Sequence, residues 1–407
     1  MTVDAPPFRR FRWSVLLLLV VILATGVFLR AWPSCGFEGV GYDENMYRGY
    51  VAMGQQRGIT NYGEVVDAYL RSQALRPEAV VPATRVGFLW PAVILAQFAE
   101  VEPILAMRAI SLVASILFLL ASVVIGYRLG KIEGMLVFTA LIAVAPLQIY
   151  LAQRSLVDGY FAFWAALCAW FFWESLQAPQ SKGWIAAYGI SLFVLVLTKE
   201  YAVFVFVALM ATLAVRWALR FDQLNLPLVV VGVAASAFAV LILARMVGGV
   251  PEWLAFWRMY AQKVHALPYA VRFQDGAWYR YLIDFAILSP CIVLLASGRI
   301  FAAGKNSEQD TFWTLFLGFS FVCLSTVTYG MDLRYAAYLD QPLRWLAASQ
   351  VILLARHVSR TRPLIVLGFA AVLLVAVDLT QYWRLFVDAG IYDPVSAQLL
   401  RASKMIK

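Results

Sequence analysis

The chain has 407 residues, of which 62% are hydrophobic and only 14% are charged. A soluble globular domain has about 25% charged and about 45–50% apolar residues, and a single core stops growing near roughly 250–300 residues. These proportions exclude one large soluble domain and predict that lipid surrounds most of the chain. The net charge is +9 at pH 7, but no nucleic-acid recognition motif accompanies it. We therefore expect no nucleic-acid partner, and we expect the basic residues to mark loops and to meet anionic lipid or phosphate.

The N-terminal region carries three arginines, Arg9, Arg10 and Arg12, followed by an apolar run from Trp13 to Leu29. The apolar stretch of a secretory signal peptide is only about 7–15 residues long. The run here is longer, and no small-residue cleavage site clearly follows it. We therefore predict a retained first membrane helix.

The apolar segments predict an all-α polytopic membrane protein with about eleven transmembrane helices, because a bilayer core about 30 Å thick needs roughly 20 apolar residues per helix. The predicted spans are 13–31, 104–127, 133–151, 160–176, 184–198, 201–217, 226–247, 281–298, 311–328, 337–355 and 363–382. The apolar stretch 86–99 is shorter and is bracketed by Pro82, Pro91 and Pro103. We predict a re-entrant or interfacial helix there, with a twelfth span as the alternative.

The positions of the basic residues predict the orientation, since Lys and Arg concentrate in short cytoplasmic loops. Eleven spans with a cytoplasmic N-terminus place every short basic loop inside. Besides the N-terminal arginines, these loops hold Arg128, Lys131, Lys182, Arg216, Arg220, Arg299, Lys305, Arg356, Arg360 and Arg362. The tail from Gln381 then lies outside. We expect an inner or plasma membrane location with the active site on the outer face.

Two long segments, 32–103 and 248–280, fall on the outer side in this topology. The second is rich in Trp and Tyr, which favour the membrane–water interface. We predict that both form helices on the membrane surface. No internal repeat or low-complexity linker divides the chain, so residues 1–407 are treated as one domain.

Cysteine and histidine patterns indicate no disulfide framework, zinc finger or His-centred metal site, because the cysteines lack CxxC spacing and the histidines are far apart. These residues are Cys35, Cys168, Cys291, Cys323, His265 and His357.

Four polar motifs interrupt the apolar pattern, and the predicted topology places all of them outside. Residues 41–47 contain adjacent carboxylates, which could hold a divalent cation or supply a base; a solvated helix N-terminus is the plainer interpretation. Residues 153–158 place Arg154 and Asp158 four apart, where they could pair on one helical face. Residues 198–201 hold charges close to hydrocarbon, which usually face a cavity or a partner; a lysine that extends toward water beside a neighbouring Glu is the alternative. Residues 329–335 form the fourth motif, with an ordinary polar turn as the alternative.

Together the four motifs indicate a reaction with an anionic leaving group. A Lys or Arg stabilises a departing phosphate, and a carboxylate takes the proton from an attacking hydroxyl or holds a metal. We also expect a hydrophobic groove beside Arg85, Arg154 and Lys199 that opens to lipid. Elsewhere, we expect Arg280 to pair with Asp284.

The order of these motifs resembles the GT-C superfamily of membrane glycosyltransferases, in the branch of protein O-mannosyltransferases and lipid A aminoarabinose transferases. Asp43 and Glu44 match the acidic motif that these enzymes carry early in the first outer loop. Arg154 and Asp158 match a basic residue followed by an Asp at the junction of the third and fourth helices.

The later motifs extend the resemblance. Lys199 is similar to the lysine of the family's Thr-Lys turn, and Arg334-Tyr335, with Pro342 downstream, resembles a late Arg-Tyr segment. One departure is that the aminoarabinose branch has a Lys-Pro-Pro element where this chain has Arg85. Arg and Lys are not interchangeable, so the departure weakens an assignment to lipid A chemistry.

The resemblance implies a glycosyltransferase that moves a sugar from a polyprenyl-phosphate donor to a glycan, lipid or protein acceptor on the outer face, usually with inversion. It implies that Asp43 is the general base or a metal-linked acid, with Glu44 beside it, and that Asp158 orients the acceptor or a metal. The phosphate-binding candidates are Arg85, Arg154, Lys199 and Arg334. We expect the substrate pocket to include Tyr42, Tyr47, Glu200, Tyr201 and Tyr335. A divalent cation at Asp43 and Asp158 is left open, and no organic cofactor is expected.

Two other classes of function remain as alternatives. A lipid or small-molecule transporter or flippase would place its site at the bilayer midplane, often between repeats, whereas the charges here lie at helix ends. Another outer-face transferase, such as an O-antigen ligase or an acyltransferase, is the second alternative. An acyltransferase would use a histidine base, for which His265 is the only outer candidate. Asp378, near the outer end of the last helix, is expected to reach water.

Overall fold

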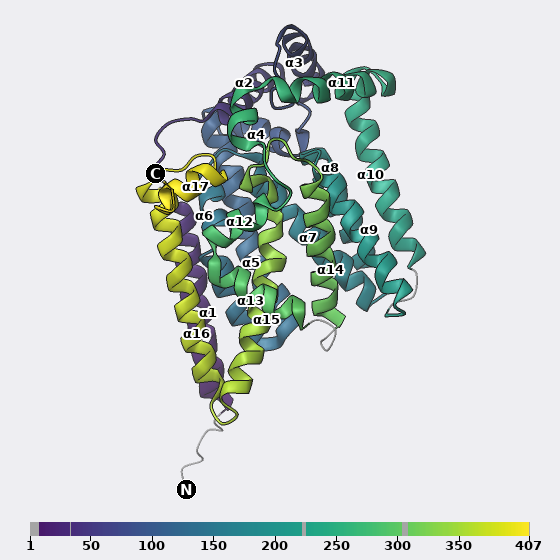
Figure 1. Cartoon of the computed structure of the whole chain (residues 1–407). Helices are drawn as coiled ribbons and strands as arrows, with labels where there is room; N and C mark the ends of the chain where they lie inside the picture. The colour runs from purple at the N-terminus through teal and green to yellow at the C-terminus, as the bar shows by residue number, and fades with distance from the viewer. Residues whose placement is uncertain (1–7, 33, 222–224, 303–307, 407) are drawn as a thin grey trace.

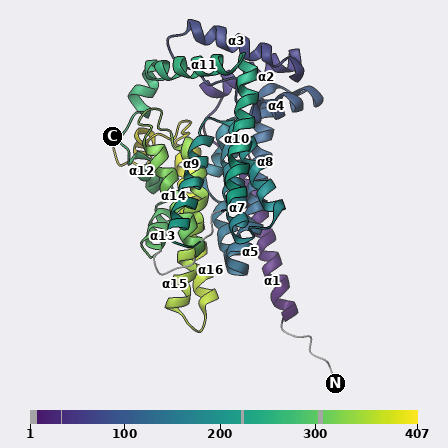
Figure 2. The ribbon, with the colours of Figure 1, turned by 90° about the vertical axis from the view of Figure 1, so that its right-hand side faces the viewer.

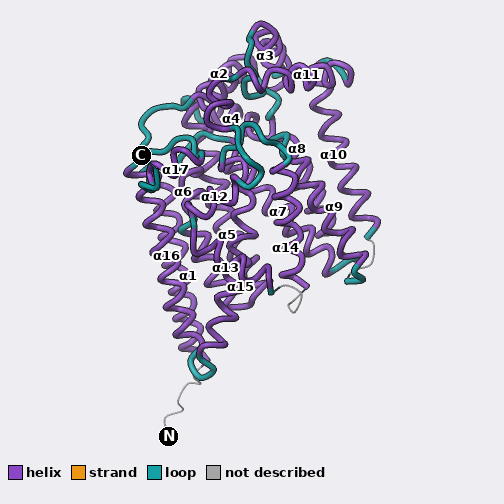
Figure 3. The backbone as a smooth tube through the Cα atoms, viewed as in Figure 1, coloured by secondary structure: helices purple, strands orange, loops and turns teal. Residues whose placement is uncertain are grey.

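The computed structural model describes residues 8–32, 34–221, 225–302 and 308–406, and this part of the chain consists of helices and loops (Figure 3). The side chains of residues 8–12, which include Arg9, Arg10 and Arg12, lie outside the described part, as does Lys305.

Long apolar helices run side by side and form a bundle (Figure 1). They are α1 (Phe8–Ala31), α5 (Pro103–Ala143), α7 (Val157–Gln177), α8 (Lys182–Thr198), α9 (Ala202–Ala218), α10 (Leu226–Val247), α14 (Glu308–Ser325), α15 (Asp340–Val358) and α16 (Pro363–Tyr382). Four segments, in α1, α5, α10 and from α16 onward, are long and apolar enough to cross a membrane. The protein is therefore an integral membrane protein, as composition predicted. The number of eleven spans stays a prediction, because the other helices are shorter, broken or less apolar.

Helix α5 consists of two arms that double back at the basic loop predicted between the second and third spans. The backbone at Gly130 and Lys131 is non-helical, and Lys131 has φ +55°. The arms approach closely: a Cβ on Gly126 would lie 2.8 Å from the carbonyl oxygen of Gly134. The predicted span 133–151 is itself divided, because α6 (Pro146–Ala152) begins after a break.

The predicted span 281–298 is also two helices, α12 (Arg280–Leu288) and α13 (Pro290–Phe301). Pro290 stands at the first position of α13, where its missing N–H costs nothing but where it ends the preceding helix. Before α15, the 3-10 segment η5 (Leu333–Leu339) carries the fourth motif into the bundle.

Surface helices α2 (Tyr42–Arg57), α3 (Gly63–Leu75) and α11 (Val250–Lys263) lie together at one end of the bundle; we call these helices the cap (Figures 1 and 2). The turn between α15 and α16 lies at the opposite end (Figure 1). Lys263 links two cap helices, since its ammonium donates to the carbonyl oxygens of Gln73 and Arg76 at 2.6 Å each.

Helix α4 (Val86–Phe98) packs between the cap and the bundle, against α2, α5 and α8. Its 13 residues span about 20 Å, less than a bilayer core of about 30 Å. This length agrees with the predicted re-entrant or interfacial helix.

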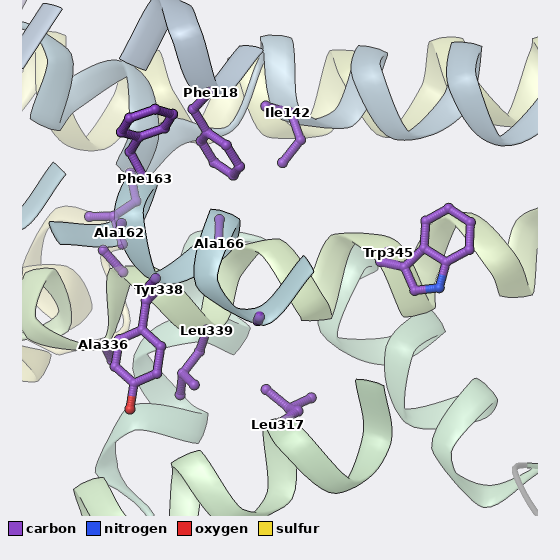
Figure 4. Close-up of a cluster of buried hydrophobic side chains, with 14 of the residues drawn as sticks. Phe118, Ile142, Ala162, Phe163, Ala166, Leu317, Ala336, Tyr338, Leu339 and Trp345 are labelled. Carbon is purple, nitrogen blue, oxygen red and sulfur yellow. The ribbon is translucent and has the colours of Figure 1, made fainter. Parts of the chain in front are cut away.

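Two apolar clusters hold these parts in place. The larger fills the bundle, where Phe118 of α5, Phe163 of α7 and Tyr338 of η5 contribute large side chains (Figure 4). The smaller lies under the cap and includes Tyr47 of α2 and Phe256 of α11. Because aromatic side chains bury large apolar areas, the cap is packed as a fixed part of the fold.

A buried arginine, Arg344 of α15, joins the ends of several helices inside the bundle. Its guanidinium pairs with Asp340 at 2.8 Å and with Asp378 at 2.5 Å, and also donates to the hydroxyl of Ser289 at 3.2 Å. The expectation that Asp378 reaches water is wrong: the residue is only 1% exposed, because Arg344 offers it a buried partner.

Candidate active site at the cap end of the bundle

Asp43 stands in the first turn of α2, where its carboxylate pairs with Arg334 of η5 at 2.7 Å. Arg334 also lies 3.2 Å from Asp332 and 3.4 Å from Asp393, so three carboxylates surround one guanidinium. Burial raises the pKa of Asp43, although Arg334 opposes the rise and Asp393 adds to it. Burial also raises the pKa of Asp332 well above its ordinary value.

Lys199 follows the last residue of α8 and pairs with Asp158 of α7 at 2.6 Å, with both side chains buried. Its ammonium also lies over two aromatic rings, 3.8 Å from the centroid of Tyr335 and 4.6 Å from that of Tyr201. Burial lowers the pKa of Lys199, while Asp158 opposes this shift. The two rings stack on each other and form one wall beside the ion pair.

Arg85 lies at the start of α4 and pairs with Glu200, with its Nε 3.2 Å from Oε2 of the carboxylate. It also donates to the hydroxyl of Tyr47 from α2. Arg85, together with Lys199, lowers the pKa of Glu200 against the effect of burial. This pair joins the second half of the third motif to the cap.

Glu44 pairs with Arg154 rather than facing solvent, and neither side chain is more than 3% exposed. The same carboxylate accepts the backbone N–H groups of Ser155 at 2.7 Å and Gly41 at 2.9 Å. The predicted pairing of Arg154 with Asp158 is wrong. Residue 154 follows the end of α6, whereas Asp158 begins α7, so the two do not share a helical face.

A cavity of about 280 Å³ opens beside two of these groups. Arg85, Lys199 and Glu200 form its polar end, while its apolar lining includes Phe206, Val240, Trp253 and Trp257. Val203, also in the lining, is 53% exposed on the outer surface of the bundle. The expected groove therefore lies beside Arg85 and Lys199, whereas Arg154 lines a second cavity.

The structure also shows the surroundings of Tyr42, of the alternative base His265 and of the predicted Arg280–Asp284 pair. Tyr42 is 49% exposed at the start of α2. His265 contacts the ring of Tyr329, 4.6 Å away between centroids, and no ion pair joins it to the acidic cluster in the described part of the chain. The Arg280–Asp284 pair forms at 3.8 Å, as predicted.

Residues of the C-terminal tail belong to this centre, and sequence reasoning missed them. Besides its contact with Arg334, Asp393 accepts the hydroxyl of Tyr269 at 2.8 Å. The ring of Tyr392 lies 4.9 Å from the Arg154 guanidinium and 5.8 Å from that of Arg334. The available signal was an acidic residue beside an aromatic one just beyond the last predicted span.

No group of three or more acidic, Cys or His side chains arranged to hold a metal ion occurs among the described residues. Asp43 and Asp158, the two residues for which a metal was left open, each pair with a cation. A metal there would have to displace Arg334 and Lys199.

Comparison with protein families finds a match in the middle of the chain. Residues 85–260 match the family described as dolichyl-phosphate-mannose-protein mannosyltransferase. A search of curated protein sequences finds no match.

Several solved structures share the fold. ArnT from Cupriavidus metallidurans bound to undecaprenyl phosphate has a TM-score of 0.57 and 16% identity, over 96% of this chain and 77% of that one. The Archaeoglobus fulgidus oligosaccharyltransferase has a TM-score of 0.64 and 14% identity, over 90% of this chain and 56% of its own. A complex of the latter with Zn and sulfate has a TM-score of 0.61 and 13% identity, over 89% of this chain and 53% of that one. The chain thus spans a little over half the oligosaccharyltransferase, and the likeness confirms the expected architecture.

Proposed function

We propose that this chain, a membrane protein with the GT-C glycosyltransferase fold, transfers a sugar from a polyprenyl-phosphate donor to an acceptor at the outer face of the membrane. Two similarities support this proposal: the match to a lipid-phosphate mannosyltransferase family and the likeness to an ArnT structure that holds undecaprenyl phosphate. The observation that carries it is geometric. Arg85, Lys199 and Glu200 line a cavity with a polar and an apolar end. The ring of Tyr335 joins Lys199 to Arg334, which pairs with Asp43.

The donor would occupy the 280 Å³ cavity. Its polyprenyl tail fits the apolar lining formed by Phe206, Val240 and the cap tryptophans. The tail would extend from the cavity into the bilayer beside the exposed Val203. Its phosphate would meet Arg85 and Lys199 at the polar end, where it has to compete with Glu200 and Asp158 for the two cations. Arg binds phosphate in a bidentate manner and Lys as a point charge, so the two donors complement each other.

The transfer step follows from the paired charges. The acceptor hydroxyl attacks the anomeric carbon, and Asp43 takes its proton. The bond between that carbon and the phosphate oxygen breaks, and the polyprenyl phosphate leaves with the electron pair while Arg85 and Lys199 stabilise its charge. Attack opposite the leaving group inverts the anomeric centre. The raised pKa of Asp43 suits a general base, which works best with a pKa near the operating pH.

Asp158 holds Lys199 in position and favours its charged form against burial. A divalent cation bound by Asp43 and Asp158 would be the alternative to direct base catalysis, and one structure of the oligosaccharyltransferase contains Zn. Insensitivity of turnover to EDTA would favour the direct route.

The outer-face location rests on the charge distribution. The turn between α15 and α16, at the end opposite the cap (Figure 1), carries Arg360 and Arg362, and such loops face the cytoplasm. We place the protein in the inner or plasma membrane as a single domain, 1–407. Segments 32–103 and 248–280 supply the cap over the site.

The central test is transfer by the purified protein, with envelope glycans and glycolipids compared by mass spectrometry with and without it to identify sugar and acceptor. Asp43→Asn is expected to lower turnover by about 10²–10⁴-fold, the usual contribution of a general base, with normal expression and thermal stability. Asp67→Asn is the matched control, since Asp67 is an exposed acid on the cap helix α3. Near-normal turnover of Asp43→Asn would remove this residue from the mechanism. Labelling that placed Asp43 and Lys199 on opposite faces would remove the shared site.

A further inference from the structure

The second cavity, of about 210 Å³, is lined by the end of α1, the loop before α2, the first turns of α5 and the end of α6. Arg30, Arg108 and Arg154 contribute to its wall, together with Cys35, Gln153 and Leu112. We propose that this cavity is a second anion site, which binds the phosphate of a lipid headgroup or of a phosphorylated acceptor. It shares no lining residue with the donor cavity, and it would exist whether or not the proposed transfer does.

The charged residues that line the second cavity are all positive. Three arginines line the cavity, and its lining contains no Asp or Glu among the described residues. Arg154 does have a carboxylate partner, Glu44, which lies outside the lining. The local field therefore favours an anion, and arginine matches phosphate better than any other side chain does.

The three arginines differ in whether their guanidinium nitrogens already donate hydrogen bonds within the protein. Arg30 is fully used: it donates to Ser115 at 2.8 Å, and to the carbonyl oxygens of Gly26 at 2.9 Å and of Ile142 and Ala143 at 2.8 Å each. In the part of the chain that the structure describes, the buried Nε of Arg108 has no acceptor, and neither has the buried Nε of Arg154.

Arg154 is the more informative of the two, because only 2% of the residue is exposed. A buried donor without an acceptor is unfavourable, and more so when the group is charged. Both Nε atoms are buried in this conformation, so a phosphate in the cavity would become an acceptor for either guanidinium after a small rotation of its side chain. Arg108, partly exposed and without an ion pair among the described residues, then supplies the free charge.

The surroundings place the cavity where a lipid headgroup can reach it. Phe28 and Trp32 near the end of α1 are 58% and 60% exposed, and Leu105 on the first turn of α5 is 51% exposed. Exposed apolar residues on membrane helices face lipid, and tryptophan favours the headgroup level. A lipid lying against α1 and α5 would bring its phosphate to Arg108.

An anion bound in the second cavity would affect the proposed catalytic centre through Arg154. Arg154 holds Glu44, and Glu44 lies beside Asp43 in the first turn of α2. An anion that draws on Arg154 therefore competes with Glu44 for the same guanidinium. Binding in the second cavity would couple to the position of the α2 N-terminus.

The test measures binding to the full chain in detergent by native mass spectrometry and by thermal shift, with three probes: phosphatidic acid, phosphatidylcholine with the same acyl chains, and inorganic phosphate. Arg108→Gln is expected to weaken binding of phosphatidic acid or of inorganic phosphate, whichever the wild type binds, about tenfold. Loss of one charge-assisted hydrogen bond has an effect of this size. Arg71→Gln is the matched control, since Arg71 is an exposed arginine on α3 and should change nothing.

The probes distinguish the sources of the anion. Binding of phosphatidic acid alone, sensitive to Arg108→Gln, assigns the site to a lipid headgroup; equal binding of inorganic phosphate assigns it to a phosphate on a water-soluble group. Binding of no probe, or binding equal in wild type and Arg108→Gln, would overturn the proposal.

A second variant guards against misfolding of the first. Leu112→Trp fills the cavity without changing any charge, and it should also abolish phosphate binding while the protein remains monodisperse in gel filtration. If Leu112→Trp folds and still binds the probe as wild type does, the cavity is not the site and the proposal fails.

Discussion

Two buried arginines in neighbouring parts of the chain, Arg334 and Arg344, differ in how completely their hydrogen bonds are made. Arg344 donates from all three guanidinium nitrogens, to Asp340, Asp378, Ser289 and a backbone carbonyl. Arg334 has three carboxylates within 3.4 Å. Yet its Nε and Nη1 lack a well-aligned acceptor among the described residues. A buried charged side chain whose donors all have acceptors is typical of a structural role. Donors without an acceptor indicate a place where a ligand can bind.

The largest expected effect is the loss of stability when Arg344 is replaced. Arg344→Ala would leave Asp340 and Asp378 buried without a cation, and removal of one partner from a buried pair costs about 3–5 kcal/mol. We expect a much lower melting temperature and poor recovery from the membrane, measured by thermal unfolding in detergent. A variant that melts like the wild type would contradict a structural role for Arg344.

Replacement of Arg334 should instead lower turnover much more than it lowers the melting temperature. Arg334→Gln keeps hydrogen-bonding capacity near Asp43 but removes the charge, and we expect turnover to fall by about 10²–10³-fold, the scale of one electrostatic stabiliser. The melting temperature should change far less than in Arg344→Ala. If both arginine variants lose stability equally while the folded fraction of Arg334→Gln keeps full turnover, the distinction between the two clusters is lost.

The pH profile of turnover gives a finer test. The proposed base must be ionised, so activity should rise as pH passes the pKa of Asp43, which burial has raised. It should fall as Lys199 loses its proton, at a pH below that of an ordinary lysine, because burial lowers its pKa. We expect a bell narrower than unperturbed Asp and Lys groups would give. An alkaline limb that stays in place in Lys199→Arg would assign that limb to another group.

The smallest expected effect comes from the tail. Asp393→Asn removes a negative charge that raises the pKa of Asp43, so the acid limb should move to lower pH while turnover at the optimum falls by only about tenfold or less. Asp388→Asn is a matched control on the same segment. A change in stability without movement of the acid limb would show that Asp393 acts on structure alone.

Most of the helices could be predicted from the sequence, since apolar length and basic loops are local signals. The breaks could be predicted less well. Pro290 divides a span because of one missing N–H, and the extended residues between α6 and α7 separate Arg154 from Asp158. In both places a single local backbone feature overrides an otherwise continuous apolar or helical pattern.

The grouping of the four motifs could be predicted from topology, but their partners could not. Spacing suggested that Arg154 would meet Asp158, whereas Arg154 meets Glu44, 110 residues earlier. Asp378 likewise finds Arg344 inside the bundle. Pairing depends on which side chains the packed helices bring within about 4 Å, and a single sequence does not carry that information.

The contribution of Tyr392 and Asp393 to the centre has a consequence for biosynthesis. These residues follow α16, so they leave the ribosome after the helices that surround the centre have been made. In the proposed topology, Asp393 then has to cross the bilayer before it can reach Arg334. A nascent chain that follows this topology would insert and pack its helices before the proposed site receives the contacts of Tyr392 and Asp393.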